Sequence, residues 1–240
     1  KTAYEISTRD WSSDVCSSDL YARDKVLMGA KREEVMQPAE KEKTAYHEAG
    51  HTLAAWFLPG AQRVHKVTVI PRGQSLGSTQ ILPSEDRMNM SAQEAKDQLV
   101  VLLAGRAAEQ LVYEETSVGA ENDLERATSL ARRMIAHWGM SDKLGPVSYK
   151  MSESDPFLGR EIHQQRLFSE KTLETIDSEI GNTLRDADER ALELLKLHRE
   201  ALNKIKDGLM AKEELEESEI KELIGPSVHE QVSLPVSTAD

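Results

Sequence analysis

Cysteine, long apolar stretches and aromatic residues are scarce in this sequence of 240 residues. The single cysteine allows no disulfide within the chain, which is consistent with a reducing compartment. No stretch of about 18 apolar residues occurs, and the mean hydropathy is −0.53, so no bilayer-spanning helix is predicted within these residues. Aromatic residues make up only 5% of the chain, so aliphatic side chains must build the core.

Positive charge is also in short supply. The chain has 30 Lys and Arg against 42 Asp and Glu, which gives a formal net charge of −12. Nucleic-acid phosphates and anionic lipid surfaces both require concentrated positive charge, so neither is expected as a main partner. A hydrophobic content of 39% with 30% charged residues is typical of a soluble, helix-rich globular domain and not of a disordered chain.

The first twenty residues differ in character from the rest of the chain. Trp11–Leu20 is rich in Ser and Asp and has no helical or strand periodicity. Asp14–Leu20 also resembles the in-frame translation of a DNA-sequencing adapter. We interpret residues 1–20 as a foreign segment or a disordered arm, and we set Cys16 aside from functional interpretation.

The remaining sequence predicts a mainly α-helical (α+β) fold with a small β-sheet and a carboxy-terminal helical bundle. Ser91, with Glu94 three residues later, has the pattern of a capping box that opens a helix. Two short β-rich runs are separated by Pro71-Arg72-Gly73 and are expected to pair. The helices are expected over residues 40–58, 91–113, 119–137, 173–198 (continuing to 209, with a break left open) and 220–224, and the strands over 64–70 and 76–82.

The segment His47-Glu48-Ala49-Gly50-His51 lies inside the first predicted helix. A spacing of four puts the two imidazoles one turn apart on the same face, so both can bind one zinc ion at about 2.0–2.1 Å. Glu48 would then lie beside the open coordination position. There it can take a proton from zinc-bound water and pass it to the leaving amine, while the metal polarises the scissile carbonyl.

The same pattern also arises by chance in helices whose His and Glu residues are ordinary surface or core side chains. Two features oppose that interpretation here. Gly50 in a helix interior costs about 1 kcal/mol relative to alanine, so we expect a compensation such as the close approach of another backbone. The Ala, Leu and Phe residues around the motif predict a buried helix, and a buried Glu between two His residues would be costly without a metal.

Zinc requires a third protein ligand and keeps one position for water. A metzincin would have Gly in place of Ala54 and His in place of Phe57, and a deformylase-type site would use a cysteine in a GCLS-like segment, unlike Cys16. Both classes are therefore excluded. The candidates for the third ligand are His65, Glu109, Glu121, Asp123 and His137.

Five segments occur in a fixed order: TAYHEAGH at 44–51, VTVIPRG at 67–73, LGST at 76–79, LAGRAAE at 103–109 and VGAENDL at 118–124. Together they resemble the protease domain of the FtsH family of membrane-anchored AAA+ zinc metalloproteases, over about residues 21–224. The resemblance implies that His47, His51 and Asp123 hold one Zn²⁺ per chain, with Glu48 as the general base. Glu109 would then be a buried structural residue or a partner of a ligand. Val118 stands where many relatives have threonine, a departure that should not affect coordination.

The strand that contains Gly77, Ser78 and Thr79 is a candidate for substrate binding. Proteases often hold a peptide in extended form by adding it to a sheet edge, so that main-chain hydrogen bonds supply the affinity. Gly77 has no side chain and would allow a close approach. The alternative is an ordinary edge strand.

The resemblance also implies a domain organisation and a parent protein. Residues 21–39 would be a linker from a missing ATPase module, 40–159 the zinc peptidase core, 160–224 a carboxy-terminal helical region, and 225–240 a flexible tail. Family members carry transmembrane helices and an AAA+ module ahead of this domain and form hexamers. We therefore expect a soluble carboxy-terminal fragment. ATP use, the homohexamer and a position at the cytoplasmic face of a bacterial inner membrane belong to the parent, whose membrane contact would run only through the missing amino-terminal segments.

The leading functional hypothesis is an endopeptidase that hydrolyses unfolded or motor-delivered polypeptides by metal-activated water. In the parent protein this activity would be coupled to ATP-driven unfolding and degradation of membrane and soluble proteins. Two alternatives remain open from the sequence: an inactive oligomerisation module of the same fold, and a zinc hydrolase that acts on a small molecule.

Overall fold

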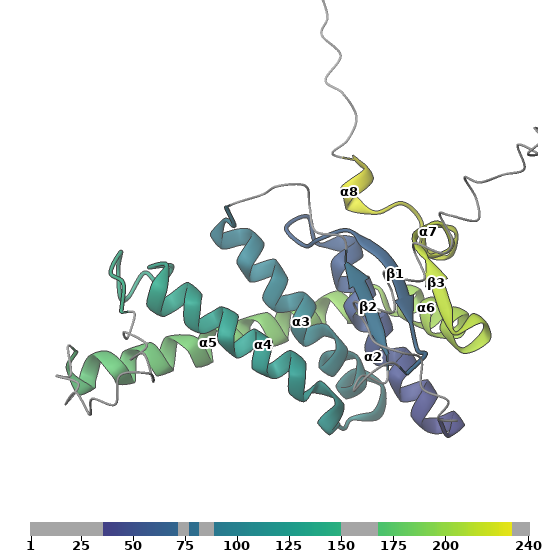
Figure 1. The fold of residues 1–240 in the computed structure, drawn as a ribbon, viewed down its shortest axis with the longest axis horizontal. Coiled ribbons are helices and arrows are strands. Elements are labelled where there is room, and N and C mark those ends of the chain that lie inside the picture. Colours follow the sequence, from purple (N-terminus) through teal and green to yellow (C-terminus); the bar gives the residue numbers. More distant parts are fainter. Residues whose placement is uncertain (1–35, 72–76, 82–88, 150–167, 232–240) are drawn as a thin grey trace, which may run out of the picture.

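The computed structural model describes residues 36–71, 77–81, 89–149 and 168–231. Its mainly helical fold with one small sheet confirms the predicted α+β class (Figure 1). The predicted arm over 1–20, with Cys16, and most of the predicted linker lie outside the described residues. In chain order the elements are α2 (Pro38–Phe57), β1 (Val64–Thr68), β2 (Ser78–Ile81), α3 (Ala92–Tyr113), a 3-10 turn (Val118–Ala120), α4 (Glu121–Arg132), a π-helical turn (Arg133–His137), α5 (Glu170–Leu197), α6 (Arg199–Lys212), β3 (Glu214–Glu216), α7 (Glu217–Ile224) and α8 (Val228–Gln231).

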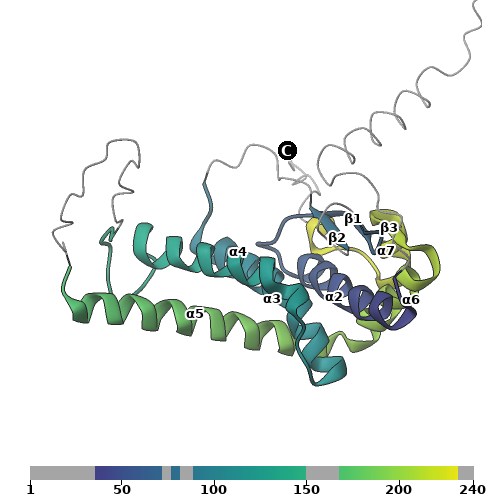
Figure 2. The ribbon, with the colours of Figure 1, turned by 60° about the horizontal axis from the view of Figure 1, so that its bottom comes forward.

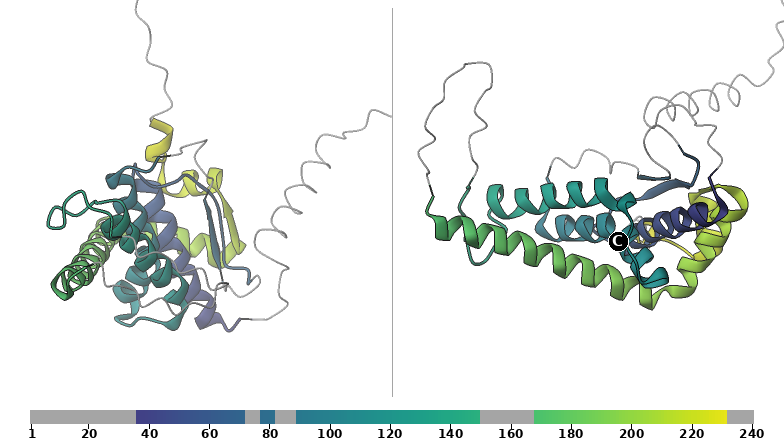
Figure 3. Two further views of the ribbon diagram at one scale, coloured as in Figure 1. Left: turned by 60° about the vertical axis from the view of Figure 1, so that its left-hand side comes forward. Right: turned by 90° about the horizontal axis from the view of Figure 1, so that it is seen from below.

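Helix α2 lies at the centre of the fold. Pro38 occupies its first turn, where the missing N–H of proline leaves no bond unmade. Every residue from Ala45 to Trp56 is buried, because α3, α6 and the sheet all pack against this helix. Figures 2 and 3 show the sheet and α5 on opposite sides of α2. The helix that carries the predicted metal motif is thus packed between α3, α6 and the sheet.

Gly50 sets how closely α2 approaches α3. A Cβ at this position would lie 2.4 Å from the carbonyl oxygen of Ala104 and 2.9 Å from the Cβ of Ala108. No side chain fits in that space, so glycine is required for the contact between the two helices. The close approach of another backbone, expected from the sequence, is confirmed.

Helix α3 begins and ends as predicted. The Ser91 hydroxyl accepts a hydrogen bond from the Glu94 N–H, and Oε2 of Glu94 accepts one from the Ser91 N–H, so the predicted capping box is present. The middle of α3 is buried nearly all round because α2 covers one face while α4 and α5 pack against others. None of the helices that the structure describes combines the length and apolar character needed to cross a bilayer.

The sheet has the order β2-β1-β3 among the described strands, and both pairs are antiparallel. Val67 of β1 lies opposite Thr79 of β2 and Leu215 of β3, with a register shift between Val64 and Lys66. The pairing of the two predicted strands is confirmed, although the ends of the second one lie outside the described residues. Strand β3 was not predicted, because only Leu215 among its three residues is buried.

The helices after residue 168 pack on the same core as α2 and α3. Helix α5 runs along α3 and α4, and α6 packs against α2 (Figure 2). The break left open in the long carboxy-terminal helix is at His198, where the backbone leaves the helical region between α5 and α6. The predicted helix over 119–137 is also divided, into a 3-10 turn, α4 and a π-helical turn.

The first part of the predicted flexible tail is instead packed against the end of α2. The indole N–H of Trp56 donates to the carbonyl of Gly225, and the Ser227 hydroxyl donates to the carbonyl of Trp56. Nε2 of His229 lies 3.0 Å from the carbonyl oxygen of Ala55. The last turn of a helix has carbonyls without partners in the helix, and this segment supplies donors to them. Residues 232–240 of the predicted tail lie outside the described residues.

Candidate metal centre

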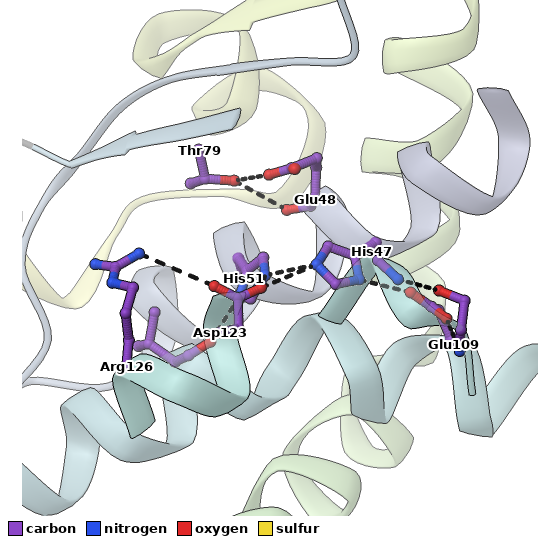
Figure 4. Close-up of polar contacts among 10 residues, drawn as sticks. His47, Glu48, His51, Thr79, Glu109, Asp123 and Arg126 are labelled. Carbon is purple, nitrogen blue, oxygen red and sulfur yellow. Dashed lines mark hydrogen bonds and ion pairs between the residues drawn. The ribbon is translucent and has the colours of Figure 1, made fainter. Parts of the chain in front are cut away.

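Three side chains from two helices converge on one point (Figure 4). His47 and His51 project from the same face of α2, and their Nε2 atoms lie 3.0 Å apart. Oδ2 of Asp123, in the first turn of α4, lies 3.2 Å from each of those nitrogens. The cluster is the one group of three or more potential metal ligands among the described residues.

The opposite nitrogen of each ring is held by a different element. Nδ1 of His51 lies 2.7 Å from the carbonyl oxygen of Val101, and Nδ1 of His47 lies 2.6 Å from Oε1 of Glu109. A carbonyl oxygen or a carboxylate can only accept, so both Nδ1 atoms carry the hydrogen. In the neutral rings, both Nε2 lone pairs then face the Asp123 carboxylate. Three lone-pair-bearing atoms therefore meet at one point, and none of them carries a hydrogen to share with the others.

This arrangement fits zinc in donor type and in spacing. Two imidazoles and a carboxylate are a common zinc ligand set, and tetrahedral ligands at 2.0–2.1 Å from one ion lie about 3.3 Å apart. The three separations observed here are 3.0, 3.2 and 3.2 Å. The residues present can therefore hold the ion that the motif predicts.

Gly105 of α3 leaves the room for this centre. A Cβ at this position would lie 2.5 Å from Nε2 of His51 and 2.6 Å from Nε2 of His47. Any other residue would therefore occupy the space beside the two Nε2 atoms that contact Asp123. The functional importance of Gly105 was not predicted; the signal in the sequence is a glycine in the middle of an alanine- and leucine-rich helix.

Burial and hydrogen bonds act in opposite directions on the pKa values at the centre. Burial opposes the charged form of His47, but hydrogen bonds to Asp123 and Glu109 and the charge of Glu48 outweigh it and raise the pKa of His47 to about 10. Burial likewise opposes ionisation of Asp123, and its hydrogen bonds to His47 and His51 outweigh that effect and hold its pKa well below the usual range. The pKa of Glu109 is lowered despite burial, because His47 and Ser117 donate to it. The carboxylates around His47 thus favour a positive charge on this ring.

Zinc binding should therefore release the proton of His47. Below pH 10 the metal-free centre carries this proton, and raising the pH removes the competitor, so zinc affinity should rise about tenfold per pH unit between pH 7 and pH 9. Titration calorimetry at pH 7 in buffers with different ionisation enthalpies measures the release, expected as at least one proton per zinc. The Glu109→Gln variant removes one of the carboxylates that raise the pKa of His47. Its zinc affinity should therefore stop rising at a lower pH than that of the unsubstituted chain. Binding without proton release would contradict this charge state.

Glu48 is buried on α2 between the three converging side chains and β2. The Thr79 hydroxyl donates to Oε2 of Glu48 at 2.7 Å (Figure 4). A Cβ on Gly77 would lie 2.8 Å from both Cγ and Oε1 of Glu48. The glycine therefore makes room for the Glu48 side chain, which is a different reason from the close approach of substrate expected from the sequence.

The other candidates for the third ligand lie outside the cluster. His65 is in β1, Glu121 is exposed at the start of α4, and His137 is in the π-helical turn. Glu109 does reach the centre, but it contacts Nδ1 of His47, on the side of the ring away from Asp123. The structure thus brings together His47, His51 and Asp123, with Glu109 as the partner of one imidazole.

Comparison with known proteins gives one family and many relatives. The model of Peptidase family M41 matches residues 34–223. ATP-dependent zinc metalloprotease FtsH 1 of Rhodopirellula baltica is 65% identical over 212 residues, which cover 88% of this chain and 32% of the relative. FtsH 4 of Sphaerobacter thermophilus is 47% identical over 204 residues, which cover 85% of this chain and 31% of the relative. The chain thus spans about a third of the length of the curated relatives it matches.

Proposed function

Because this chain belongs to Peptidase family M41, we propose that it is a zinc-dependent endopeptidase that hydrolyses unfolded polypeptides, with Glu48 as the general base. The family membership bears out the predicted resemblance to FtsH proteases. The observation that carries the proposal is the convergence of His47 Nε2, His51 Nε2 and Asp123 Oδ2 beside a buried Glu48. A solvated helix face would not place three such groups together inside the protein.

Each residue of the centre has a separate role in this proposal. His47, His51 and Asp123 would hold Zn²⁺, which when bound activates water and polarises the scissile carbonyl. Glu109 and the carbonyl of Val101 fix the ring orientations of the two histidines. The Glu48 carboxylate would accept the proton of the attacking water and transfer it to the leaving amine.

The edge of the sheet supports a polypeptide as the substrate. Strand β2 is at one end of the described sheet and packs against α2 beside Glu48. An extended peptide that adds to the edge of the sheet beside Ser78 and Thr79 would pass the metal centre and would depend little on its own sequence. A small-molecule hydrolase has no use for such an edge.

The inactive-module alternative is opposed by the completeness of the centre. A scaffold would need neither the three converging ligands nor the carboxylate of Glu109, which is 4% exposed and paired with one of them. Burying such groups is costly unless they bind something. The relatives are named ATP-dependent metalloproteases. We extend the proposal to the whole protein as ATP-driven delivery of substrates to a hexamer at the cytoplasmic face of a bacterial inner membrane.

Removal of the metal tests the proposed function directly. The purified chain should contain about one zinc per chain and cleave casein, because the three ligands provide one site. A zinc chelator should abolish cleavage, and added zinc should restore it. Cleavage that persists in the chelated chain, or a zinc-loaded chain that hydrolyses only small esters, would contradict a zinc endopeptidase. Circular dichroism of the same samples reports the helix content and so separates loss of metal from loss of fold.

A further inference from the structure

Two residues at the start of β2 enclose the carboxylate of Glu48: Gly77, directly before the strand, and Thr79 within it. The Thr79 hydroxyl and the position that a Cβ on Gly77 would take both lie against the Glu48 side chain, on one face of the sheet. Thr79 lies opposite Val67, whose side chain is fully buried, so this face is the one that packs on α2. Gly77 leaves the space that Glu48 occupies, and Thr79 donates a hydrogen bond into it.

The HExxH pattern does not itself fix the carboxylate. It places the Cα of Glu48 next to that of His47, but a glutamate side chain has three torsions that remain to be set. Among the described residues, the Thr79 hydroxyl is the donor that reaches this carboxylate, at 2.7 Å from Oε2. The hydroxyl has a single hydrogen, and its other acceptor, the Glu48 carbonyl oxygen, is 3.4 Å away. The short contact to a charged group is the stronger bond.

We propose that Thr79 is a positioning residue of the peptidase: its hydroxyl holds Oε2 of Glu48, so that Oε1 is presented for proton transfer. This inference rests on the proposed function, because it assigns the orientation of its general base. It also separates two roles within one residue. The backbone of Thr79 belongs to the proposed substrate edge, whereas its side chain faces Glu48 (Figure 4).

Thr79→Val and Thr79→Ser test the role of the hydroxyl in the zinc-loaded chain. Valine keeps the branched shape without a donor, so kcat for an unfolded peptide should fall about 10- to 100-fold while KM stays within about twofold. Serine keeps the donor and should restore most of kcat. Zinc content and affinity should be unchanged in both, since Thr79 contacts none of the three ligands. Thr183→Val is the matched control, because it removes a hydroxyl that bonds to the carbonyl of Glu179 far from the centre.

Three kinetic outcomes would overturn the inference. They are a Thr79→Val variant with normal kcat, an equal loss in Thr79→Ser, and a rise in KM at constant kcat, which would mean contact with substrate. Crystal structures of the zinc-loaded chain without substitution (the parent chain of these variants) and of Thr79→Val give a readout independent of activity. Glu48 should keep its bond to Thr79 in the parent and take another orientation in the variant; an unchanged Glu48 would refute the positioning role. A parent chain that binds zinc but cleaves no peptide would instead contradict the proposed function.

Discussion

The Gly105→Ala variant is expected to bind zinc about 10- to 100-fold more weakly than the unsubstituted chain while its helices remain folded. The added methyl would lie 2.5 Å from Nε2 of His51 and 2.6 Å from Nε2 of His47, the two nitrogens that contact Asp123. The rings cannot easily retreat, because the carbonyl of Val101 and the carboxylate of Glu109 hold their other nitrogens. Peptidase activity should be lost together with the metal.

The Gly181→Ala variant is a matched control for this experiment. Gly181 also lies inside a long helix, but a Cβ there would meet only the end of the flexible Arg185 side chain, at 3.4 Å. Alanine should therefore raise the free energy of unfolding by about 1 kcal/mol and leave zinc affinity unchanged. Competition with a fluorescent zinc chelator measures affinity, and circular dichroism measures helix content. A folded Gly105→Ala variant with the affinity of the parent would show that this glycine does not make room for the metal.

The sequence was sufficient to predict the parts of the site that depend on local spacing. His47 and His51 share a helical face because four residues make about one turn, and this needs no knowledge of the fold. The capping box at Ser91 and Glu94 is local in the same sense, since both bonds close within one turn. Gly50 was also informative, because a helix tolerates glycine at some cost and the cost indicates a close contact.

The third ligand could not be chosen from spacing, because it depends on how three helices pack. Glu109 on α3 and Asp123 on α4 both reach His47, and they reach opposite nitrogens of the same ring. Only the resemblance to a family separated them. The carbonyl of Val101 was beyond prediction, since every residue has a carbonyl and nothing in the sequence marks this one.

Long-range contacts account for the other differences between expectation and structure. Strand β3 exists because Leu215 fills a place beside Val67 of β1, and its acidic neighbours give no alternating pattern. The polar composition of the segment around Ser227 and His229 led to the prediction of a flexible tail. Those polar groups are instead donors to the end of α2, about 170 residues earlier in the chain.

The Glu48→Gln variant should retain zinc and lose kcat by a factor of about 10² to 10⁴. Glutamine has nearly the same shape, and its amide oxygen can still accept the hydrogen bond from Thr79, so the fold and the metal ligands should be unaffected. It cannot accept a proton at neutral pH, which removes the transfer from water to the leaving amine. Zinc content and the rate of peptide cleavage, measured on the same preparation, report the two properties separately.

This substitution also decides between the proposed peptidase and a scaffold that keeps the same fold. Glu189→Gln is the matched control, because Glu189 is exposed on α5 and the same chemical change there should leave cleavage at the parental rate. An inactive assembly module would show no zinc-dependent cleavage in the parent, so all three proteins would behave alike. Equal, zinc-dependent cleavage by the parent and Glu48→Gln would instead keep the metal enzyme and refute the general base. Loss of cleavage confined to Glu48→Gln, with zinc retained, is the result expected from a buried carboxylate that lies beside the metal ligands and binds none of the metal itself.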